Sequence, residues 1–492
     1  MRLEGTTSRL DQLLERHSAS IDHAAERHRL PLHVLFLEEV ERNAHGFLDV
    51  AHHLYPNTLV AFAAKSNPCR GALRAARAQG LGADVASEYE LRAALEEGIE
   101  PNRITCNGNA KSDAYLAEAT EAGALIAVDN EDELNTLAAL AAVGDRRPPI
   151  LVRFRGMPLS GLTAADQSTA ADWTKFGFHL DEAAEIFARL RTLDALRFDG
   201  ISAHIGTQIA DPNGYERLLK HLFELCEVAT ATGLRLRVID IGGGFPVSFL
   251  DKETWDRFSA NLLARLRGKT GIEEAATWND LPMGYAHLGS GEADGERWIG
   301  KSYWTGRPAS KMLEHLLQYR FADGRSTVDR LKELGTPSLI VEPGRSLMAT
   351  AGVTLTQVMG VKSVLGHSVV SLDLGINNHG TNLITPDIFP TSVLPLREDD
   401  LEEEVFLAGR LCFSGDMISK AKVRLNRMPK RGDRLVLYHT GAYGADHFAS
   451  HSCGFPRPAK VAVRGDGEIE VWRHAERFED VFGSPADPLV HC

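Results

Sequence analysis

Lys65 is the first residue of this sequence whose type and position together could carry chemistry. It ends the apolar run AFAAK, so a strand over that run would carry the amine at its carboxyl end. A lysine in such a place is most often a solvated charge. If it is partly desolvated, however, the amine can lose its proton and attack an aldehyde to form a Schiff base. Lys65 is therefore a candidate nucleophile whose role depends on its surroundings.

Three consecutive glycines, Gly242, Gly243 and Gly244, follow the apolar run RVIDI. A backbone without side chains can approach a phosphate closely and direct its amides toward it. A tight turn explains a bare triplet of glycines equally simply. The spacing is neither the dinucleotide-binding G-x-G-x-x-G pattern nor a Walker loop. The triplet alone thus leaves phosphate binding and a turn both open.

Two further runs end in residues of interest. His204 ends GISAH, where a histidine is usually structural but could also stack flat on an aromatic ring. Glu342 ends SLIVE and is followed closely by Arg345. The carboxylate could hold a proton on a heterocyclic nitrogen, and the arginine could pair with a phosphate. The simpler alternative is a surface ion pair that contributes little.

The four signals are weak singly but agree with one another. A lysine, a phosphate-binding backbone, a flat-stacking imidazole and an acid with an arginine all stand at the same ends of different predicted strands. Together they describe a site for a phosphorylated heterocycle that bears an aldehyde and can be protonated. Pyridoxal 5'-phosphate (PLP) has these properties.

The elements that would position these residues are eight apolar runs rich in β-forming residues. They start at Thr58, Ala83, Arg103, Leu125, Ile150, Gly200, Arg237 and Ser338. Helical patterns separate most of them, with Ser87 and Ser112 as candidate N-caps. Eight alternating strands and helices predict an α/β fold of the (β/α)8 TIM-barrel type, although an open doubly wound sheet has a similar pattern.

The pattern changes after Arg345, where short β-type runs with turns between them replace the alternation. The turn Gly465-Asp466-Gly467 between VAVR and EIEVW predicts a hairpin. The sequence therefore predicts a C-terminal, mostly antiparallel β domain over 346–492 and a barrel over 34–345.

Composition restricts the partners of this chain. With 492 residues it is long enough for two domains, and its formal charge of −13 argues against nucleic acid as a partner. No apolar run approaches the roughly 20 residues of a membrane span, and the N-terminus lacks the apolar core of a signal peptide. The six scattered cysteines are typical of reduced thiols in a cytoplasmic protein.

The order of several motifs resembles the fold type III PLP-dependent decarboxylases, the group that includes diaminopimelate, ornithine and arginine decarboxylases. The resemblance runs from about Pro31 to near the C-terminus. It is carried by the blocks AFAAKSN, GADVASEYEL, SAHIGTQI, IDIGGGFP, VEPGR, LCFSGD and GAYG. It implies an alanine-racemase-like fold in which the N-terminal segment, residues 1–33, joins the β domain.

The resemblance also implies roles for single residues. Lys65 would be the Schiff-base lysine with Asp84 near it, and His204 would stack on the cofactor ring. Glu342 would pair with the pyridinium nitrogen. The phosphate would be held by Thr207, Gly242, Gly243, Gly244, Arg345 and the hydroxyl of Tyr443.

Three residues of LCFSGD would lie at the substrate side of the site, reaching it from the second subunit of a homodimer with shared active sites. Cys412 would be the acid that reprotonates the substrate's Cα, so that Lys65, His204 and Cys412 form the expected catalytic set. Phe413 and Asp416 would contact the substrate.

Two departures bear on the substrate. Phe413 stands where the diaminopimelate branch has Glu and the polyamine branch has Asp, and the Arg-Pro pair of the diaminopimelate branch is missing after SLDLG. The expected substrate is therefore a non-standard amino acid and not diaminopimelate. An insertion at about 268–325, rich in aromatic residues, could cover the barrel mouth or pack on its outside.

Alternatives remain at this point. A racemase or epimerase could use the same barrel, and a non-catalytic regulatory homologue could bind a partner instead. The sequence favours the decarboxylase because the cofactor residues are all present and LCFSGD resembles that branch. His447, His451 and Cys453 have a spacing that could bind a metal, but without a paired CxxC we expect no metal there.

Overall fold

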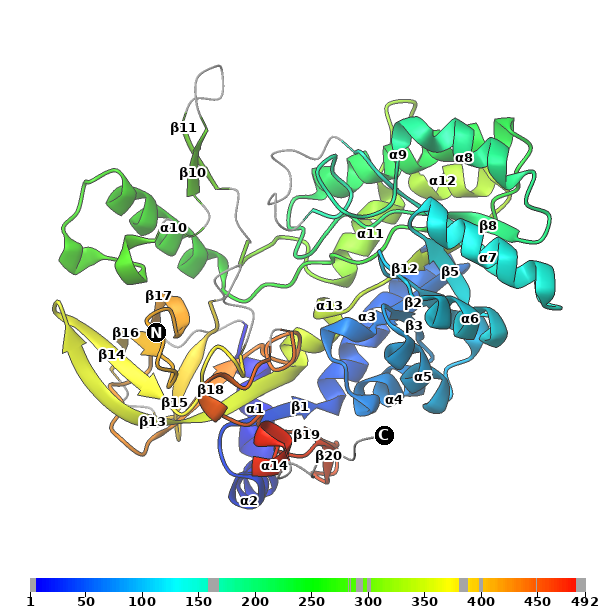
Figure 1. Ribbon diagram of the computed structural model, residues 1–492. Coiled ribbons are helices and arrows are strands. Elements are labelled where there is room, and N and C mark those ends of the chain that lie inside the picture. Colours follow the sequence, from blue (N-terminus) through cyan, green and yellow to red (C-terminus); the bar gives the residue numbers. More distant parts are fainter. Residues whose placement is uncertain are drawn as a thin grey trace, which may run out of the picture. The chain divides into compact units, whose positions relative to one another are not determined.

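The computed structural model describes residues 6–157, 168–281, 283, 285–288, 295–298, 302–379, 388–397, 401–447 and 449–483 (Figure 1). The chain forms two compact units. One contains Val40–Val247 and Ala286–Met348, and the other contains Met1–Glu39, Ser248–Tyr285 and Ala349–Cys492. We call them the barrel and the β domain.

The barrel is a closed ring of eight parallel strands. Their order is β2-β3-β4-β5-β6-β8-β9-β12, with β12 pairing β2 to complete the ring. The strands are β2 (Thr58–Ala63), β3 (Gly82–Val85), β4 (Ile104–Cys106), β5 (Leu125–Val128), β6 (Pro149–Arg155), β8 (Arg197–Ser202), β9 (Val238–Asp240) and β12 (Ser338–Val341). A two-residue strand, β7 (Phe178–His179), pairs with β6. Each predicted apolar run is one of the eight strands, so the TIM-barrel prediction is confirmed and the open sheet is excluded.

Helices accompany the barrel strands, and several of them begin at a side-chain cap. They are α3 (Leu37–Leu54), α4 (Arg70–Ala78), α5 (Glu88–Glu96), α6 (Asp113–Ala122), α7 (Glu131–Val143), α8 (Ala183–Leu190), α9 (Pro212–Ala231), α11 (Ser310–Gln318), α12 (Thr327–Glu333) and α13 (Arg345–Met348). The Ser87 hydroxyl accepts the Glu90 amide at 3.2 Å and Ser112 accepts the Tyr115 amide at 3.1 Å. A small apolar cluster inside the ring includes Ala61, Leu125, Ala127, Leu151 and Ile340.

The β domain is a mostly antiparallel sheet, as predicted. Its strands are β1 (Leu32–Phe36), β13 (Gly352–Val364), β14 (His367–Leu372), β15 (Thr391–Leu394), β16 (Glu403–Ala408), β17 (Met417–Leu425), β18 (Arg434–Tyr438), β19 (Ala459–Val463) and β20 (Ile469–Arg473). β1 lies between β13 and β19, antiparallel to the first and parallel to the second. A short helix, α14 (Phe478–Phe482), follows the last strand.

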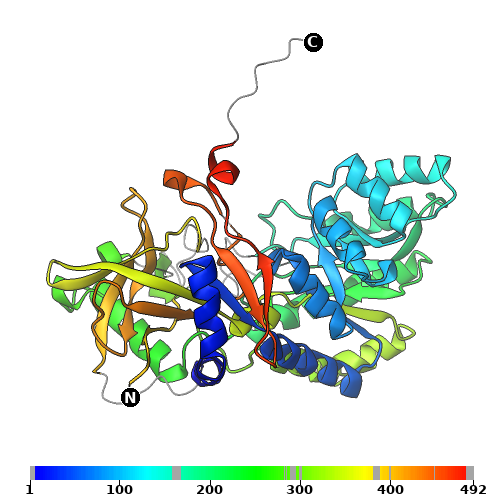
Figure 2. The same ribbon diagram turned by 90° about the horizontal axis from the view of Figure 1, so that it is seen from below.

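Two N-terminal helices complete the core of the β domain. α1 (Ser8–Arg16) and α2 (Ser18–His28) bury Leu10, Leu13 and Ile21 against strands β1, β13, β18 and β19. Figure 2 shows these helices beside the sheet. Because apolar faces from both ends of the chain share one core, the N-terminal segment is held in the domain by burial of that apolar surface.

The unit boundaries differ from those expected at one place. The sequence predicts a barrel over all of 34–345 with an insertion at about 268–325, whereas the structure groups Ser248–Tyr285 with the β domain. This segment contains α10 (Lys252–Leu266), which Figure 1 shows over strands of that domain. The hairpin of β10 (Tyr285–Leu288) and β11 (Gly295–Trp298) follows it.

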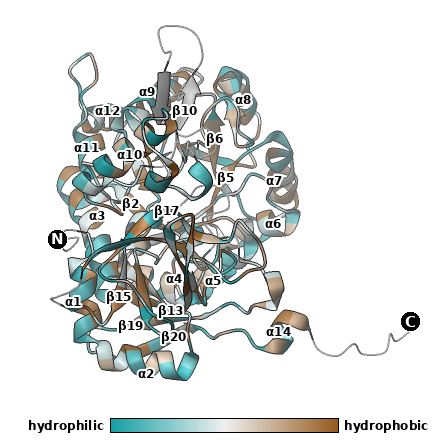
Figure 3. Ribbon diagram, turned by 90° about the vertical axis from the view of Figure 1, so that its left-hand side faces the viewer, coloured by the Kyte–Doolittle hydropathy of each residue, from teal (hydrophilic) through white to brown (hydrophobic). Residues whose placement is uncertain are grey.

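Surface helices of the described residues mix apolar and polar residues. Along α1 and α2, Figure 3 shows hydrophilic and hydrophobic residues together. None of the helices in the described ranges combines the length and the apolar character needed to cross a membrane.

Candidate active site

Lys65 lies in a single 3-10 turn, Ala64–Ser66, directly after β2. Its Nζ lies 2.5 Å from Oδ2 of Asp84, whose carboxylate is fully buried. β2 and β3 pair with Ala63 opposite Asp84, so the sheet register itself brings the acid beside the lysine. The Lys65 side chain remains 39% exposed. The amine is thus held by a buried carboxylate and is still accessible.

Asn107 connects Asp84 to the acid expected at the end of β12. Its Nδ2 donates to Oδ1 of Asp84 at 2.8 Å and to Oε1 of Glu342 at 2.7 Å. Asn107 follows β4 and Glu342 follows β12. The chain of contacts Lys65–Asp84–Asn107–Glu342 therefore runs across the carboxyl ends of the strands, the end at which TIM barrels carry their active sites.

Glu342 and Asp240 form a buried pair of acids. Burial, reinforced by the neighbouring carboxylates Asp240 and Asp84, raises the pKa of Glu342 well above its usual range. Burial also raises the pKa of Asp240 to about 7, although its Oδ1 accepts the Gly242 amide at 2.8 Å. Two acids that cannot both ionise keep a proton between them near neutral pH, so the pair can donate a hydrogen bond or protonate a base placed against it.

Arg153 is a buried cation near these acids. Its guanidinium lies 3.6 Å from Asp129 and 4.2 Å from the centre of the Phe176 ring. It also interacts electrostatically with Glu342, and burial lowers its pKa. Arg153 sits inside the run ILVRF, where a charge in an otherwise apolar strand was the signal that could have identified it. Neither Arg153 nor Asn107 is among the predicted site residues.

His204 follows β8 and carries no charge at neutral pH. Its burial, together with the positive charges of Lys65 and Arg153, lowers its pKa to about 3. The Gly206 amide donates to Nδ1 at 3.0 Å, which places the proton on Nε2. A Cβ on Gly242 would lie 3.0 Å from Cα, Cβ and Cγ of His204, so the first glycine of the triplet allows this histidine to pack against the loop backbone.

The glycine triplet directs its carbonyls toward the protein. The Gly242 carbonyl accepts from the Glu342 amide at 2.9 Å, the Gly243 carbonyl from the Tyr215 hydroxyl at 2.8 Å and the Gly244 carbonyl from the Ile209 amide at 2.9 Å. Among the residues that the structure describes, the Gly243 and Gly244 amides have no acceptor. Amide groups without acceptors are what an anion-binding backbone provides.

Two more residues expected at a phosphate lie together. Nη2 of Arg345 donates to the Thr207 hydroxyl at 3.3 Å. Arg345 begins α13 after Gly344, where a Cβ would lie 2.9 Å from both Ala63 and Ser66. The absence of a side chain at Gly344 thus lets the arginine's loop pack against the turn that carries Lys65.

The remaining expected residues belong to the β domain. Cys412 and Phe413 are exposed in the loop between β16 and β17. Asp416, in the same loop, is buried, and its carboxylate accepts the amides of Ile376 at 2.8 Å and Leu411 at 2.6 Å. One carboxylate oxygen of Asp416 thus holds the backbone of its own loop and the other holds the segment after β14, and the role of Asp416 at the substrate stays a prediction.

Tyr443 follows β18 with a positive φ of 63°, and its ring lies 5.1 Å from that of His447. Of the other residues considered for a metal, His451 is bonded to Glu476 at 2.8 Å and Cys453 is exposed. In the described ranges, no three His, Cys, Asp or Glu side chains gather as a metal site.

Comparison with known proteins finds a pyridoxal-binding domain in this chain. Residues 38–270 match the family described as "Pyridoxal-dependent decarboxylase, pyridoxal binding domain". The diaminopimelate decarboxylase of Methanothermobacter thermautotrophicus is 27% identical over 469 residues, covering 93% of this chain and 92% of that protein. The uncharacterized protein y4yA of Sinorhizobium fredii is 28% identical over 468 residues, covering 93% and 92%.

Solved structures share the fold. Diaminopimelate decarboxylase from M. jannaschii in complex with L-lysine has a TM-score of 0.75 at 22% identity, covering 95% of this chain and 94% of that one. Lysine/ornithine decarboxylase from Vibrio vulnificus has a TM-score of 0.63 at 21% identity, covering 90% and 96%. The chain thus carries a pyridoxal-binding decarboxylase domain over residues 38–270, is a carboxy-lyase with pyridoxal 5'-phosphate as its cofactor, and is similar over most of its length to fold type III PLP-dependent amino-acid decarboxylases.

Proposed function

We propose that this enzyme removes the α-carboxylate from a non-standard amino acid other than diaminopimelate, with Lys65 as the residue that binds PLP covalently. The observation that carries the proposal is the chain of contacts from Lys65 through Asp84 and Asn107 to Glu342. It places an accessible amine at one end and a protonated acid at the other, which suits the aldehyde and the ring nitrogen of one heterocycle.

The residues around this chain of contacts fit the rest of the cofactor. The Gly243 and Gly244 amides, which have no acceptor among the described residues, would hold the phosphate together with Arg345 and Thr207. We assign Tyr443 to the same group on the strength of its GAYG motif. The uncharged imidazole of His204 would stack on the ring without placing a positive charge beside it.

Bound PLP supplies an electron sink for the electron pair that remains on Cα when CO2 leaves. Glu342 would strengthen that sink by keeping a proton at the pyridine nitrogen, and its raised pKa means that it can carry the proton there at neutral pH. Asp84 orients the Lys65 amine. Asn107 keeps Asp84 and Glu342 at a fixed separation, because one amide group donates to both.

We further propose that Cys412 acts at the active site of a second subunit, delivering a proton to Cα. Its thiol is exposed, as a group that serves a neighbouring subunit must be before assembly. Asp416 would shape the Cys412 loop through its bonds to the loop backbone. Phe413, 55% exposed, would offer an apolar surface to the substrate side chain in place of an acid, which argues against a substrate with a distal ammonium group.

The test begins with the visible absorption spectrum of the purified protein and of Lys65→Ala. We expect a yellow band that borohydride bleaches, absent from the variant and present in Lys332→Ala, which removes an exposed lysine on α12. A protein that stays colourless with excess PLP would overturn the proposal.

Substrate class is tested by a screen for products. Amino acids, including meso-diaminopimelate, are incubated with the holoenzyme, and CO2, amines and the configuration at Cα are measured. Release of CO2 and an amine from a non-standard amino acid supports the proposal. Efficient turnover of meso-diaminopimelate would overturn the substrate part, and an inverted amino acid without CO2 would overturn the reaction.

A further inference from the structure

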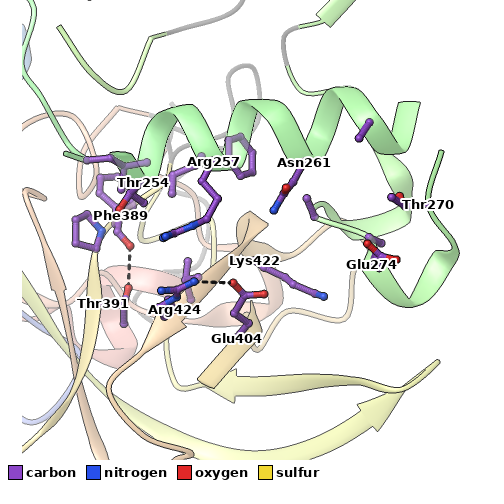
Figure 4. Close-up of a pocket in the computed structure, with 18 of the residues that line it drawn as sticks. Thr254, Arg257, Asn261, Thr270, Glu274, Phe389, Thr391, Glu404, Lys422 and Arg424 are labelled. Carbon is purple, nitrogen blue, oxygen red and sulfur yellow. Dashed lines mark hydrogen bonds and ion pairs between the residues drawn. The ribbon is translucent and has the colours of Figure 1, made fainter. Parts of the chain in front are cut away.

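The pocket between α10 and strands β16 and β17 is lined by as many acids as cations (Figure 4). Arg424 and Glu404, which Figure 4 shows side by side, lie 3.4 Å apart as an ion pair. This lining favours neither an anion nor a cation. Polar contacts that bear on the proposed active site lie instead in the barrel, in residues 168–177 just before β7, which we call the strap.

The first end of the strap is joined by its main chain to the loop that follows β8. Ser168 forms an isolated antiparallel bridge with Gly206. The Thr169 amide donates to the Ile205 carbonyl at 3.3 Å. These two contacts align the start of the strap with the loop that carries His204.

The other end of the strap is anchored at β5 and β6. The Gly177 amide donates to Oδ2 of Asp129, which follows β5, at 2.9 Å. The Phe176 ring lies 4.2 Å from the guanidinium of Arg153 in β6. In the barrel, β6 lies between β5 and β8. The strap therefore crosses the carboxyl end of β6, and its two ends are fixed at the neighbouring strands.

Thr169 reaches His204 with its side chain. Its hydroxyl donates to the His204 carbonyl at 2.5 Å, and the same Oγ1 lies 3.2 Å from Nδ1 of the imidazole. Because Nδ1 also accepts the Gly206 amide, it is an acceptor in this arrangement, and the hydroxyl is the donor to both of its partners. One hydroxyl thus contacts the main chain and the ring of the same residue, which restricts rotation of the imidazole.

The Thr169 hydroxyl is not needed to hold the strap in place. The main chain does so through the Thr169 amide and through the Met157 amide, which donates to the Ala170 carbonyl at 2.8 Å. Met157 and Ala170 are both fully buried. The side-chain contact is therefore additional to the bonds that fix the strap, and its partner is a residue of the candidate active site.

We propose that Thr169 is a positioning residue that fixes the His204 imidazole in the orientation in which it stacks on the PLP ring. This inference rests on the proposed function, in which His204 lies against that ring. A hydroxyl that donates to Nδ1 also favours the tautomer with its proton on Nε2, so it helps to keep the imidazole uncharged. Without the hydroxyl the strap should stay in place, but the ring should be free to rotate.

The first measurement is hydrogen exchange of the Gly206 amide in the holoenzyme, resolved by nuclear magnetic resonance. In Thr169→Val this amide should exchange roughly three- to tenfold faster, because its acceptor Nδ1 is no longer held in place. Thr169→Ser keeps the hydroxyl and should restore the wild-type rate. Thr174→Val removes another hydroxyl from the strap and is the matched control, which should exchange as the wild type does.

The second measurement is the visible circular dichroism of bound PLP, together with its Kd from equilibrium dialysis. In Thr169→Val we expect a weaker dichroic signal and a Kd that rises roughly three- to tenfold, as the loss of one hydrogen bond allows. Thr169→Ser and Thr174→Val should both resemble the wild type. A loss in either of them as large as that in Thr169→Val would overturn the proposal, because packing of the strap and not the hydroxyl would then be responsible.

His204→Ala separates this inference from the proposed function on which it rests. If Thr169 acts through the imidazole, Thr169→Val should add nothing to the rise in Kd that His204→Ala causes alone. Additive losses, or wild-type behaviour of Thr169→Val beside a weakened His204→Ala, would overturn the inference and leave the proposed function standing. Wild-type affinity in His204→Ala would overturn the stacking role of His204 and this inference with it.

Discussion

Asn107 donates a hydrogen bond to Glu342 at 2.7 Å, which joins the end of β4 to the end of β12 across the two strands between them. The same amide group donates to Asp84 at 2.8 Å. The neutral side chain of Asn107 thus separates two acids. One is the Asp84 carboxylate, which contacts Lys65, and the other is Glu342, which retains its proton.

We predict that Asn107→Ala lowers kcat/KM roughly 10²-fold, because both acids lose the donor that fixes their positions. It should also lower the free energy of unfolding by about 1–3 kcal/mol, since two buried acceptors lose a partner. Steady-state kinetics and urea denaturation measure the two effects. Asn57→Ala removes a single exposed amide bond to Thr336 and is the control. Equal losses in both variants would contradict the role assigned to Asn107.

The barrel was predictable because its strands are buried on both faces. A strand of this kind reads as a short continuous apolar run, and all eight runs proved to be barrel strands. Lys65, His204 and Glu342 were then found at the ends of runs, where the barrel places chemistry. Their common location follows from the parallel direction of the strands alone. That direction can be predicted from a single sequence.

Residues that act through others could not be selected in this way. Asn107 follows a three-residue strand and resembles any polar loop residue until Asp84 and Glu342 are seen on either side of it. Asp240 ends β9 just before the glycine triplet. The prediction at this strand end named the glycines and not the acid. Arg153 carried a usable signal, a charge inside a buried run, but its meaning depends on Asp129 being opposite. Such pairings link distant parts of the chain and are not local properties of the sequence.

The placement of Ser248–Tyr285 was missed for a similar reason. A helix that follows a barrel strand is expected to cover the barrel, and α10 has an ordinary N-cap in Asp251 whose carboxylate accepts the Thr254 amide at 2.8 Å. What assigns the segment to the β domain is its contact with β17 near Ala276 and its Trp278 ring on Phe406. Neither contact can be predicted from the spacing of residues along the segment.

Gly243→Ala should impair the binding of PLP. A Cβ at this position would lie 2.4 Å from the Glu342 carbonyl oxygen, so the loop must shift. Its amides would then no longer point toward the proposed phosphate position. We expect at least a tenfold rise in the Kd for PLP, measured by equilibrium dialysis with the visible band as readout. Gly360→Ala, which meets no atom within 4 Å, is the control. Unchanged PLP affinity would argue against the triplet as the phosphate site.

The stability of the β domain should depend on pH through His439. Burial lowers the pKa of His439 to about 4, whereas a histidine in the unfolded chain titrates near 6.5. Between these values the unfolded state binds more protons, so this residue's contribution is fully favourable above about pH 6.5 and is lost as the pH falls toward 4.

The variant His439→Leu should therefore flatten the pH profile of the free energy of unfolding. The wild-type slope between pH 4.5 and 6 should exceed that of the variant by up to about 1.4 kcal/mol per pH unit. Urea denaturation followed by near-ultraviolet circular dichroism across this range measures the slopes, with pH 8 as the common reference. Parallel profiles would show that His439 does not titrate as its burial indicates.

Phe413→Glu should shift the enzyme toward substrates with a distal ammonium group. An acid at this position would supply the charge-assisted bond that the wild type lacks, which corresponds to about 1.5–3 kcal/mol, or roughly 10- to 100-fold in kcat/KM for meso-diaminopimelate. Phe478→Glu, an exposed phenylalanine on α14, is the matched control. If meso-diaminopimelate turnover stays equally low in both variants, Phe413 does not face the substrate.

Mixing inactive variants tests whether two chains share each active site. Lys65→Ala and Cys412→Ala should each be inactive alone. If Cys412 serves the barrel of its partner, half of the dimers formed by co-expression contain one intact site, and about a quarter of wild-type activity should return. Co-expression of Lys65→Ala with Glu342→Gln is the control, because both changes disable the barrel of their own chain and no intact site can form. Recovery in the first mixture but not in the second requires a dimer with shared sites. Activity in neither mixture would mean that Cys412 and Lys65 act within one chain. Full activity of Cys412→Ala alone would mean that Cys412 has no part in the reaction.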